Sequence, residues 1–151
     1  MKRSIVTDRV FLTKKCELVT ETELPGIIQD LEDSFVGVRG YGLSANQIGI
    51  QKQVAIIRVG EVNNPGYWKL DLINPVIVSK DGKTVFPKEG CLSFPGIRID
   101  TSRYNEIIIE TGFEPERKRY YHYGLESVIL QHECGHLMGQ LIFDFKHKAR
   151  K

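Results

Sequence analysis

The segment HECGH at positions 132–136 has the HExxH pattern of a metal-binding helix. Residues four apart lie on the same face of a helix, so the imidazoles of His132 and His136 can reach one metal ion. Glu133 then stands where it can bond a metal-bound water and act as its base. The alternative is that two surface histidines share this spacing by coincidence. If the helix is buried, two histidines and a glutamate without partners would be costly, which favours the metal site.

The helix that carries this motif is expected to run from about Gly124 to Met138. Its apolar residues form two faces, one made by Leu125, Val128 and Ile129 and the other by Leu130, Cys134 and Leu137. A helix that is apolar on most of its circumference is usually buried in the middle of a domain. The two histidines continue the first face, so they would point into the interior.

Two histidines leave a metal short of a protein ligand, and Cys91 in the segment EGCLS at 89–93 is the candidate. Two Pro and two Gly stand within a few residues of it, which is the composition of a shaped loop. By itself Cys91 fits either a third ligand or a small buried apolar residue, and the second interpretation is preferred for Cys16 and Cys134. One Cys and two His leave the fourth position open for water, the catalytic arrangement.

The other elements are predicted from apolar spacing and turn residues. An apolar stripe from Leu24 to Phe35 predicts a helix, with Thr20 and Glu23 as its start signal and Gly37 as its stop. Asp81-Gly82 is typical of a hairpin turn. The segment 40–49 is interpreted as an irregular loop, and strands are expected at 53–59, 69–73, 76–79, 105–110 and 119–123.

The composition of the 151-residue chain bounds its class. Apolar residues make up 41%, and 28 Ile and Val against 15 Leu and Ala favour strands and exclude a pure helical bundle. A net charge of +2 gives no sign of a nucleic-acid or membrane partner, and the basic runs 117–119 and 146–151 are interpreted as solvated charge. No segment has the length of a membrane span or the pattern of a signal peptide. Without an export signal, a reducing compartment is expected, and three cysteines, an odd number, also argue against a disulfide framework.

Three stretches, in this order and spacing, resemble the motifs of peptide deformylases: GYGLSANQIG at 40–49, EGCLS at 89–93 and QHECGH at 131–136. The resemblance extends from about Asp8 to Asp144. It implies an α+β fold in which antiparallel β-sheets surround a central buried helix that carries the HExxH motif, as one catalytic domain over residues 1–151. It also implies a metal-dependent hydrolase that removes the N-formyl group from the initiator methionine of nascent polypeptides and releases formate.

The resemblance implies a role for each matching residue. The positions that match the metal ligands are Cys91, His132 and His136. Glu133 matches the catalytic carboxylate, and the Gln47 amide and the Leu92 backbone N–H match the groups that face the oxyanion. The positions that match the substrate cleft are Tyr41, Gly42, Glu89, Gly90, Arg98, Leu125, Val128 and Ile129. For Arg98, a solvated surface arginine is the alternative.

The chain departs from the family pattern in three places. Gly135 stands where the family usually has Asp, and Ser44-Ala45 replaces the usual Ala-Ala. Only 15 residues follow His136, so the chain is similar to a short form whose C-terminal extension is largely missing. Gly135 is a weak helix former. Arg103 lies near a basic position of the family, and we expect Gly135 to leave it without a partner.

The resemblance further implies one divalent metal ion, with Fe(II) as the ion in the cell and Zn(II), Ni(II) or Co(II) as ions of purified protein. The implied partners are N-formylmethionyl nascent peptides and, transiently, the ribosome surface, with no specific nucleic acid and no membrane. The expected compartment is the cytoplasm of a bacterium or of a phage-infected bacterium. An organelle stroma or matrix is the alternative.

Two other functions stay open at this point. An HExxH endopeptidase usually takes its third ligand downstream of the helix, where His147 is the one remaining histidine. A metal-dependent module could instead capture formylated N-termini without turnover, and Gly135 and the short C-terminus keep that alternative open. Comparing internal peptide bonds with formylated N-termini as substrates separates the first from a deformylase, and released formate separates the second. A structural zinc site is disfavoured, because it would leave Glu133 as a buried charge with no role.

Overall fold

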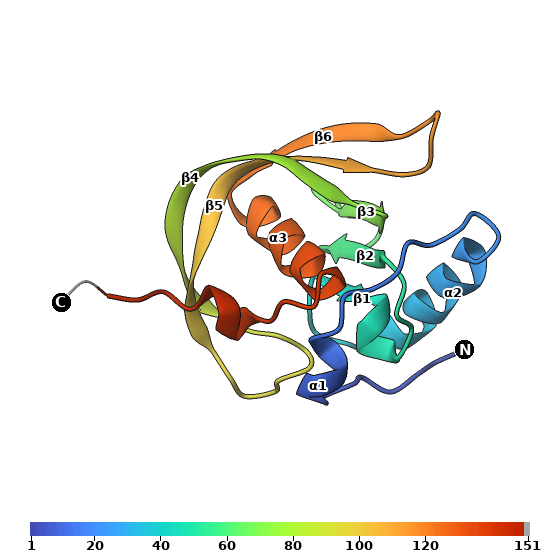
Figure 1. Ribbon diagram of the computed structural model, residues 1–151, viewed down its shortest axis with the longest axis horizontal. Helices are drawn as coiled ribbons and strands as arrows, with labels where there is room; N and C mark the ends of the chain where they lie inside the picture. The colour runs from blue at the N-terminus through green and yellow to red at the C-terminus, as the bar shows by residue number, and fades with distance from the viewer. Residues whose placement is uncertain (150–151) are drawn as a thin grey trace.

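The computed structural model describes residues 1–149, and Arg150 and Lys151 at the end of the basic tail lie outside the described residues. Within residues 1–149 the chain forms helices and two antiparallel sheets (Figure 1). The helices are α1 (Arg9–Leu12), α2 (Leu24–Phe35) and α3 (Leu125–Leu137), with the 3-10 helices η1 (Ala45–Ile48) and η2 (Ile142–Phe145). The strands are β1 (Gly42–Ser44), β2 (Val54–Val59), β3 (Trp68–Ile73), β4 (Val76–Glu89), β5 (Ile99–Thr111) and β6 (Lys118–Tyr123).

The two sheets enclose α3. One sheet has the strand order β1-β2-β3 and the other β4-β5-β6, and every neighbouring pair is antiparallel. Strands of both sheets contact α3, and Figure 1 shows the long, curved strands β4 and β5 passing around it. The predicted α+β fold with a central buried helix is therefore confirmed. No helix within the described residues is both long enough and apolar enough to cross a membrane.

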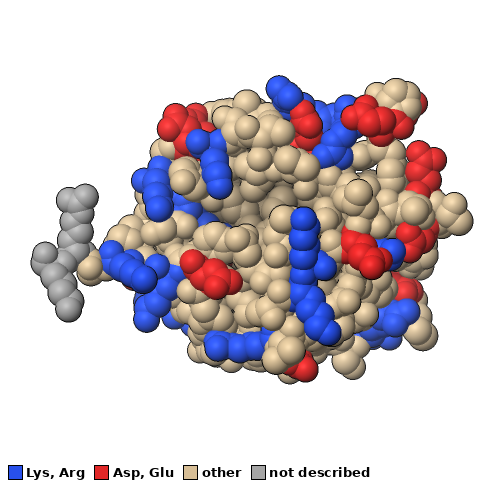
Figure 2. Space-filling model, in the orientation of Figure 1, with Lys and Arg blue, Asp and Glu red and all other residues tan. Residues whose placement is uncertain are grey.

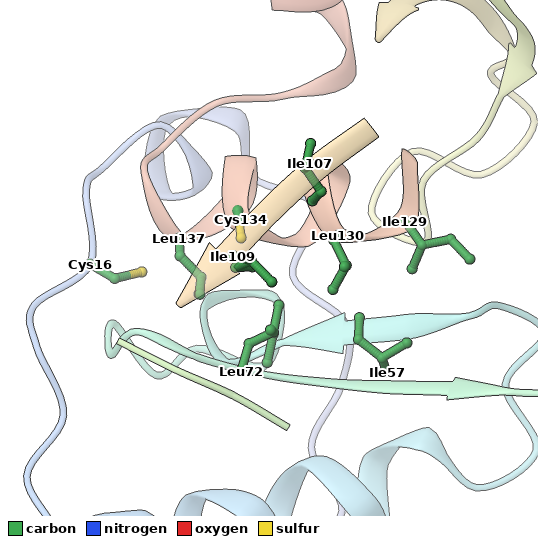
Figure 3. Close-up of a cluster of buried hydrophobic side chains, with 10 residues drawn as sticks. Cys16, Ile57, Leu72, Ile107, Ile109, Ile129, Leu130, Cys134 and Leu137 are labelled. Carbon is green, nitrogen blue, oxygen red and sulfur yellow. The ribbon is translucent and has the colours of Figure 1, made fainter. Parts of the chain in front are cut away.

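Apolar side chains on both sides of α3 hold it in the centre. From α3, Ile129, Leu130 and Leu137 join one buried cluster that also contains residues of both sheets (Figure 3). The sheet residues of this cluster are Ala55, Ile57, Leu72, Ile107 and Ile109. Burying one such aliphatic side chain stabilises the fold by about 1.5–3 kcal/mol, so the central position of α3 is strongly preferred. The HExxH segment is thereby carried into the interior.

The predicted hairpin turn at Asp81-Gly82 is wrong. Both residues lie inside β4, where Asp81 is paired with Glu106 and Lys83 with Tyr104 of β5. Gly82 adopts a φ of 69°, and its N–H bonds the Asp81 carboxylate, so the local turn signal produces only an irregularity in the strand. The pairing continues on both sides because β5 is long enough to match all of β4. The two strands connect instead through residues 90–98, the loop that carries Cys91.

Segment 40–49 is more regular than expected. It contains β1, which pairs with β2, followed directly by η1. The Gln47 side-chain oxygen accepts hydrogen bonds from the Ser44 N–H at 3.1 Å and hydroxyl at 3.0 Å, which caps the start of η1. Gly49 ends the turn with a φ of 88°, where an L side chain would be strained. The helix at 24–35 and the expected strands are present, in part with longer bounds.

Candidate active site

Three side chains from two elements converge beneath a cleft. Sγ of Cys91 lies 3.3 Å from Nε2 of His136, which lies 3.2 Å from Nε2 of His132. One ligand atom from each residue lies within 4.8 Å of the other two. Bonds of about 2.0–2.3 Å to one tetrahedral ion would separate N and S ligands by about 3.3–3.6 Å. The three residues therefore fit a single divalent ion.

The position of Cys91 follows from an irregularity in the sheet. The pairing of β4 with β5 shifts register between Phe86 and Glu89, as at a bulge, and bulges redirect a strand. Glu89 becomes buried at the end of β4, and the loop after it brings Cys91 to α3. Cys91 is itself buried, whereas Cys16 and Cys134 are buried in the core cluster around α3 and stand outside the metal-capable group.

A buried carboxylate orients His132. Glu89 accepts a hydrogen bond from Nδ1 of His132 at 2.7 Å, and Arg103 donates to both of its oxygens at 2.8 and 2.6 Å. Burial alone would raise the pKa of Glu89, but the hydrogen bonds from His132 and Arg103 outweigh it and hold this pKa at about 2. The charged carboxylate fixes the imidazole so that its Nε2 faces Nε2 of His136, within the metal-capable group.

These contacts bear on two expectations from the sequence. Glu89 lines the cleft, and its carboxylate is bonded to His132, Arg103 and the hydroxyl of Thr101, 2.6 Å away. Its charge is therefore held by these three partners. The prediction that Gly135 leaves Arg103 without a partner is wrong, since Arg103 pairs with Glu89 across adjacent strands.

Glu133 has the environment of a proton-transfer group. Its side chain is 3% exposed, and Oε2 has no hydrogen-bond partner within the described residues. Burial raises the pKa of Glu133 to about 7, although the nearby His132 acts in the opposite direction. Oε1 lies 3.9 Å from Nε2 of His132, beside the metal-capable group. A carboxyl with a pKa near neutrality can both take and return a proton at physiological pH.

Glycine is the only residue type that fits at position 42, beside Glu133. A Cβ at this position would lie 2.8 Å from the carbonyl oxygen of Ile56 and 3.1 Å from Oε2 of Glu133. Gly42 belongs to β1, an edge strand whose neighbour on one side is β2. The Tyr41 carbonyl accepts from the N–H of Arg58, so the alternation of an antiparallel pair turns the N–H and C=O of Gly42 toward the open edge.

Two further donors lie next to Cys91. Gln47 is buried, and its amide nitrogen donates to the Ser93 hydroxyl at 3.0 Å and lies 3.7 Å from Sγ of Cys91. Its oxygen is held by Ser44, which fixes the orientation of the amide. The N–H of Leu92 has no acceptor within residues 1–149. Both groups can therefore donate to an oxygen that carries developing charge.

A cleft of about 900 Å³ opens over these residues. Val128 and Ile129 are buried in its wall, Leu125 is partly exposed, and Arg98 lies on the rim with its guanidinium against Gly90. The predicted site residues that line the cleft are Tyr41, Gly42, Gln47, Glu89, Gly90, Cys91, Leu92, Arg98, Leu125, Val128, Ile129, His132 and Glu133. His136 lies deeper, at the metal-capable group.

The cleft also contains Phe86, which sequence reasoning missed. Phe86 is on β4, seven residues beyond the point where the sequence interpretation ended the strand. The strand continues through Asp81-Gly82 as far as Glu89, so Phe86 belongs to the strand that leads into the loop of Cys91. Phe86 was missed because the Asp-Gly turn signal made the predicted strand end too early.

A buried helix that presents two histidines and a glutamate to a facing cysteine, at the floor of an open cleft, is the architecture of a metal-dependent hydrolase. The family model for polypeptide deformylases matches residues 2–151. The chain belongs to the polypeptide deformylase family, whose enzymes remove the formyl group from nascent peptides in a metal-dependent reaction.

Individual relatives agree with this membership. The chain is 37% identical over 143 residues to a peptide deformylase of Karelsulcia muelleri, covering 93% of this chain and 75% of the relative. Its structure is similar to that of peptide deformylase from Plasmodium falciparum, with a TM-score of 0.84, 30% identity and coverage of 96% and 87%. For the Thermotoga maritima enzyme the TM-score is 0.83, the identity 30% and the coverage 98% and 99%.

Proposed function

We propose that this chain deformylates N-formylmethionyl nascent polypeptides, with Cys91, His132 and His136 as the metal ligands and Glu133 as the proton-transfer residue. The observation that carries this proposal is the convergence of the three ligand atoms within 4.8 Å beside a buried carboxylate oxygen of Glu133 that has no partner in the described chain. A structural site would be closed by a fourth protein ligand and would give Glu133 nothing to do.

Each group then has one task in the reaction. A divalent ion bound by the three ligands supplies Lewis-acid polarisation and lowers the pKa of water. Glu133 takes the proton of the attacking water and hands it to the departing amine, so one residue is first base and then acid. The Gln47 amide and the Leu92 N–H donate to the formyl oxygen as its negative charge develops. The products are formate and a polypeptide with an unblocked amino terminus.

The polypeptide is proposed to bind as an added strand along the open edge of β1. The N–H and C=O of Gly42 pair with its backbone, and Gly90, which also lines the cleft, leaves room for the Arg98 guanidinium beside it. The Tyr41 carbonyl is already bonded to Arg58, so Tyr41 contributes its half-exposed side chain instead. Arg98 meets the chain at the rim. The pocket for the methionine side chain is formed by Leu125, Val128 and Ile129.

This site is expected to select both the acyl group and the first side chain. Formyl-Met peptides should release formate, while acetyl-Met peptides should be essentially inert, because only hydrogen fits on the carbonyl carbon beside the buried ligands. Replacing Met by Asp or Lys should lower kcat/KM at least about 10-fold, the effect of one lost apolar contact of about 1–3 kcal/mol. Rates on matched peptides measure both effects. Equal rates on formyl and acetyl peptides would contradict the proposed site.

Fe(II) is the proposed ion in the cell. A thiolate ligand suits the softer divalent ions, and both Fe(II) and the Cys91 thiolate are open to oxidation. Activity of the iron-loaded protein should therefore decay in air, whereas protein reconstituted with Ni(II) should stay active for longer. Formate release is followed during exposure to air for both preparations. Identical decay of the iron and nickel preparations would argue against iron as the sensitive component.

We further propose that the chain works as one catalytic domain in a bacterial-type cytoplasm or an organelle interior, near ribosomes. Lys88, Arg98, Lys146 and His147 line a hollow of about 610 Å³ beside the cleft, together with Ile99 and one acidic residue, Asp100. Basic side chains gather at the side of the molecule where the described chain ends (Figure 2). Such a cluster suits the phosphates of a ribosome surface, and binding of this kind weakens as salt rises. Cosedimentation with ribosomes that is unchanged between low and high salt would contradict it.

A further inference from the structure

The segment after α3 returns to the region behind the metal ligands. In Figure 1 it leaves the end of α3, forms η2 and then passes the strands β4 and β5. Lys146 makes an isolated antiparallel bridge with Thr101 of β5, and the N–H of His147 donates to the carbonyl oxygen of Asp100 at 2.8 Å. At the other end of η2, the Asp144 carboxylate accepts from the N–H of Leu141 at 2.8 Å. These bonds fix the half-buried Phe145 against β5.

The ring of Phe145 covers the guanidinium of Arg103. The central carbon of that guanidinium lies 4.2 Å from the ring centroid, and the Arg103 side chain is 2% exposed. A cation over an aromatic face is attracted to it, more strongly where water is excluded. Arg103 bonds both oxygens of Glu89, and Glu89 bonds Nδ1 of His132. Phe145 is thus connected to a metal ligand through an unbroken set of buried contacts.

Gly135 of α3 faces this ring. A Cβ at position 135 would lie 3.7 Å from Cε2 of Phe145 and 3.8 Å from Cβ of Gln140, which are ordinary contacts. Alanine fits there, but a longer side chain would enter the space of the ring. Glycine in a helix interior is unfavourable by itself, and the ring does not require it, since alanine fits. What the ring of Phe145 excludes from position 135 is a side chain longer than alanine.

We propose that Phe145 is a positioning residue of the metal site: its ring holds Arg103 against Glu89, and Glu89 thereby holds His132 in the ligating orientation. The inference rests on the proposed ligands Cys91, His132 and His136. Without the ring, water reaches the guanidinium and competes for its hydrogen bonds to Glu89. Groups that support a ligand in this way tune metal affinity without touching the metal.

The test compares the parent chain with Phe145→Ala, Phe145→Tyr and Phe35→Ala. Zn(II) dissociation constants are measured by competition with a chromophoric chelator, and melting temperatures on the metal-free proteins. Phe35 is a matched control, because it is a half-buried phenylalanine on α2 that packs in a different core cluster. Phe145→Ala should raise the Zn(II) dissociation constant about tenfold, the lower end for groups that support a ligand. Phe145→Tyr and Phe35→Ala should bind Zn(II) as the parent does.

Two results would overturn this role while leaving the proposed ligands in place. One is an unchanged Zn(II) affinity in Phe145→Ala, and the other is an equal weakening in Phe35→Ala, which would reduce the effect to general loosening. A parent chain that binds no Zn(II) would instead refute the proposed ligands, and the positioning role with them. Binding by the parent, unaffected by Phe145→Ala, would contradict the positioning role alone.

A second set of variants tests whether the side chain at position 135 and the Phe145 ring compete for the same space. Gly135→Asp should lower both the melting temperature and the Zn(II) affinity of the parent, because its carboxylate meets the Phe145 ring. Gly135→Ala, the control, should lower neither the melting temperature nor the Zn(II) affinity. In the Phe145→Ala background the same Asp can occupy the emptied space beside Arg103 and should recover part of the lost affinity. Such opposite effects in two backgrounds are the signature of directly coupled sites. The same effect of Gly135→Asp in both backgrounds would contradict the proposal.

Discussion

Glu133→Gln is expected to abolish formate release while leaving the metal in place. Glutamine keeps the size and burial of Glu133 but cannot take the proton from the attacking water. General acid–base groups contribute typically about 10²–10⁴-fold, so kcat should fall at least about 100-fold. Metal content and the affinity for a hydroxamate inhibitor should stay near the parent values, since the ligands are intact. A paired measurement of formate release and inhibitor binding checks both parts.

Glu126→Gln is the matched control for this variant. It makes the same chemical change on the same helix, but Glu126 pairs with His122 and lies outside the lining of the cleft. It should release formate at the parent rate. Undiminished turnover in Glu133→Gln would refute the assignment of Glu133 as base and acid.

Cys91→Ser is expected to remove the metal from the protein. Loss of a ligand should exceed the roughly 10–100-fold loss of affinity seen for groups behind a ligand, so we expect the Zn(II) dissociation constant to rise more than about 100-fold. Cys134→Ser is a close control, because both cysteines are 8% exposed and only Cys91 belongs to the metal-capable group. It should lower the melting temperature by placing a hydroxyl in the core, but keep the metal.

Metal content per chain and melting temperature are measured for both variants. Full metal content and full activity in Cys91→Ser would show that the third ligand is another residue. Metal loss in Cys134→Ser at a temperature where the protein is folded would also contradict the ligand set.

The helix α3 was predictable because its signals are local. His132 and His136 are four apart, and the apolar residues around them repeat at helical spacing, so one segment of α3 contains both the ligand spacing and the reason for burial. The strands were predictable in the same way wherever their apolar runs were uninterrupted. The order of the three family motifs then identified Cys91 as the candidate third ligand. From its own surroundings, Cys91 fitted either a ligand or a small buried apolar residue.

The error at Asp81-Gly82 has a physical cause. A two-residue turn signal describes what the chain would do locally, but β5 offers a partner along the whole of β4, and the continuous ladder prevails. The partner of Arg103 was missed for a related reason. Glu89 and Arg103 meet only because β4 and β5 pair with a shifted register, and that register cannot be read from either segment alone. The contact of the Phe145 ring with Arg103 also joins residues far apart in the sequence, so it could not be predicted from either segment alone.

The most direct test of the account is formate release from a formyl-Met peptide by anaerobically prepared, iron-loaded protein, before and after complete removal of the metal. We expect one formate for each new amino terminus, loss of release when the metal is removed, and recovery when Fe(II) or Ni(II) is restored. No formate from protein that holds one ion per chain, or release that persists after the metal has gone, would contradict it.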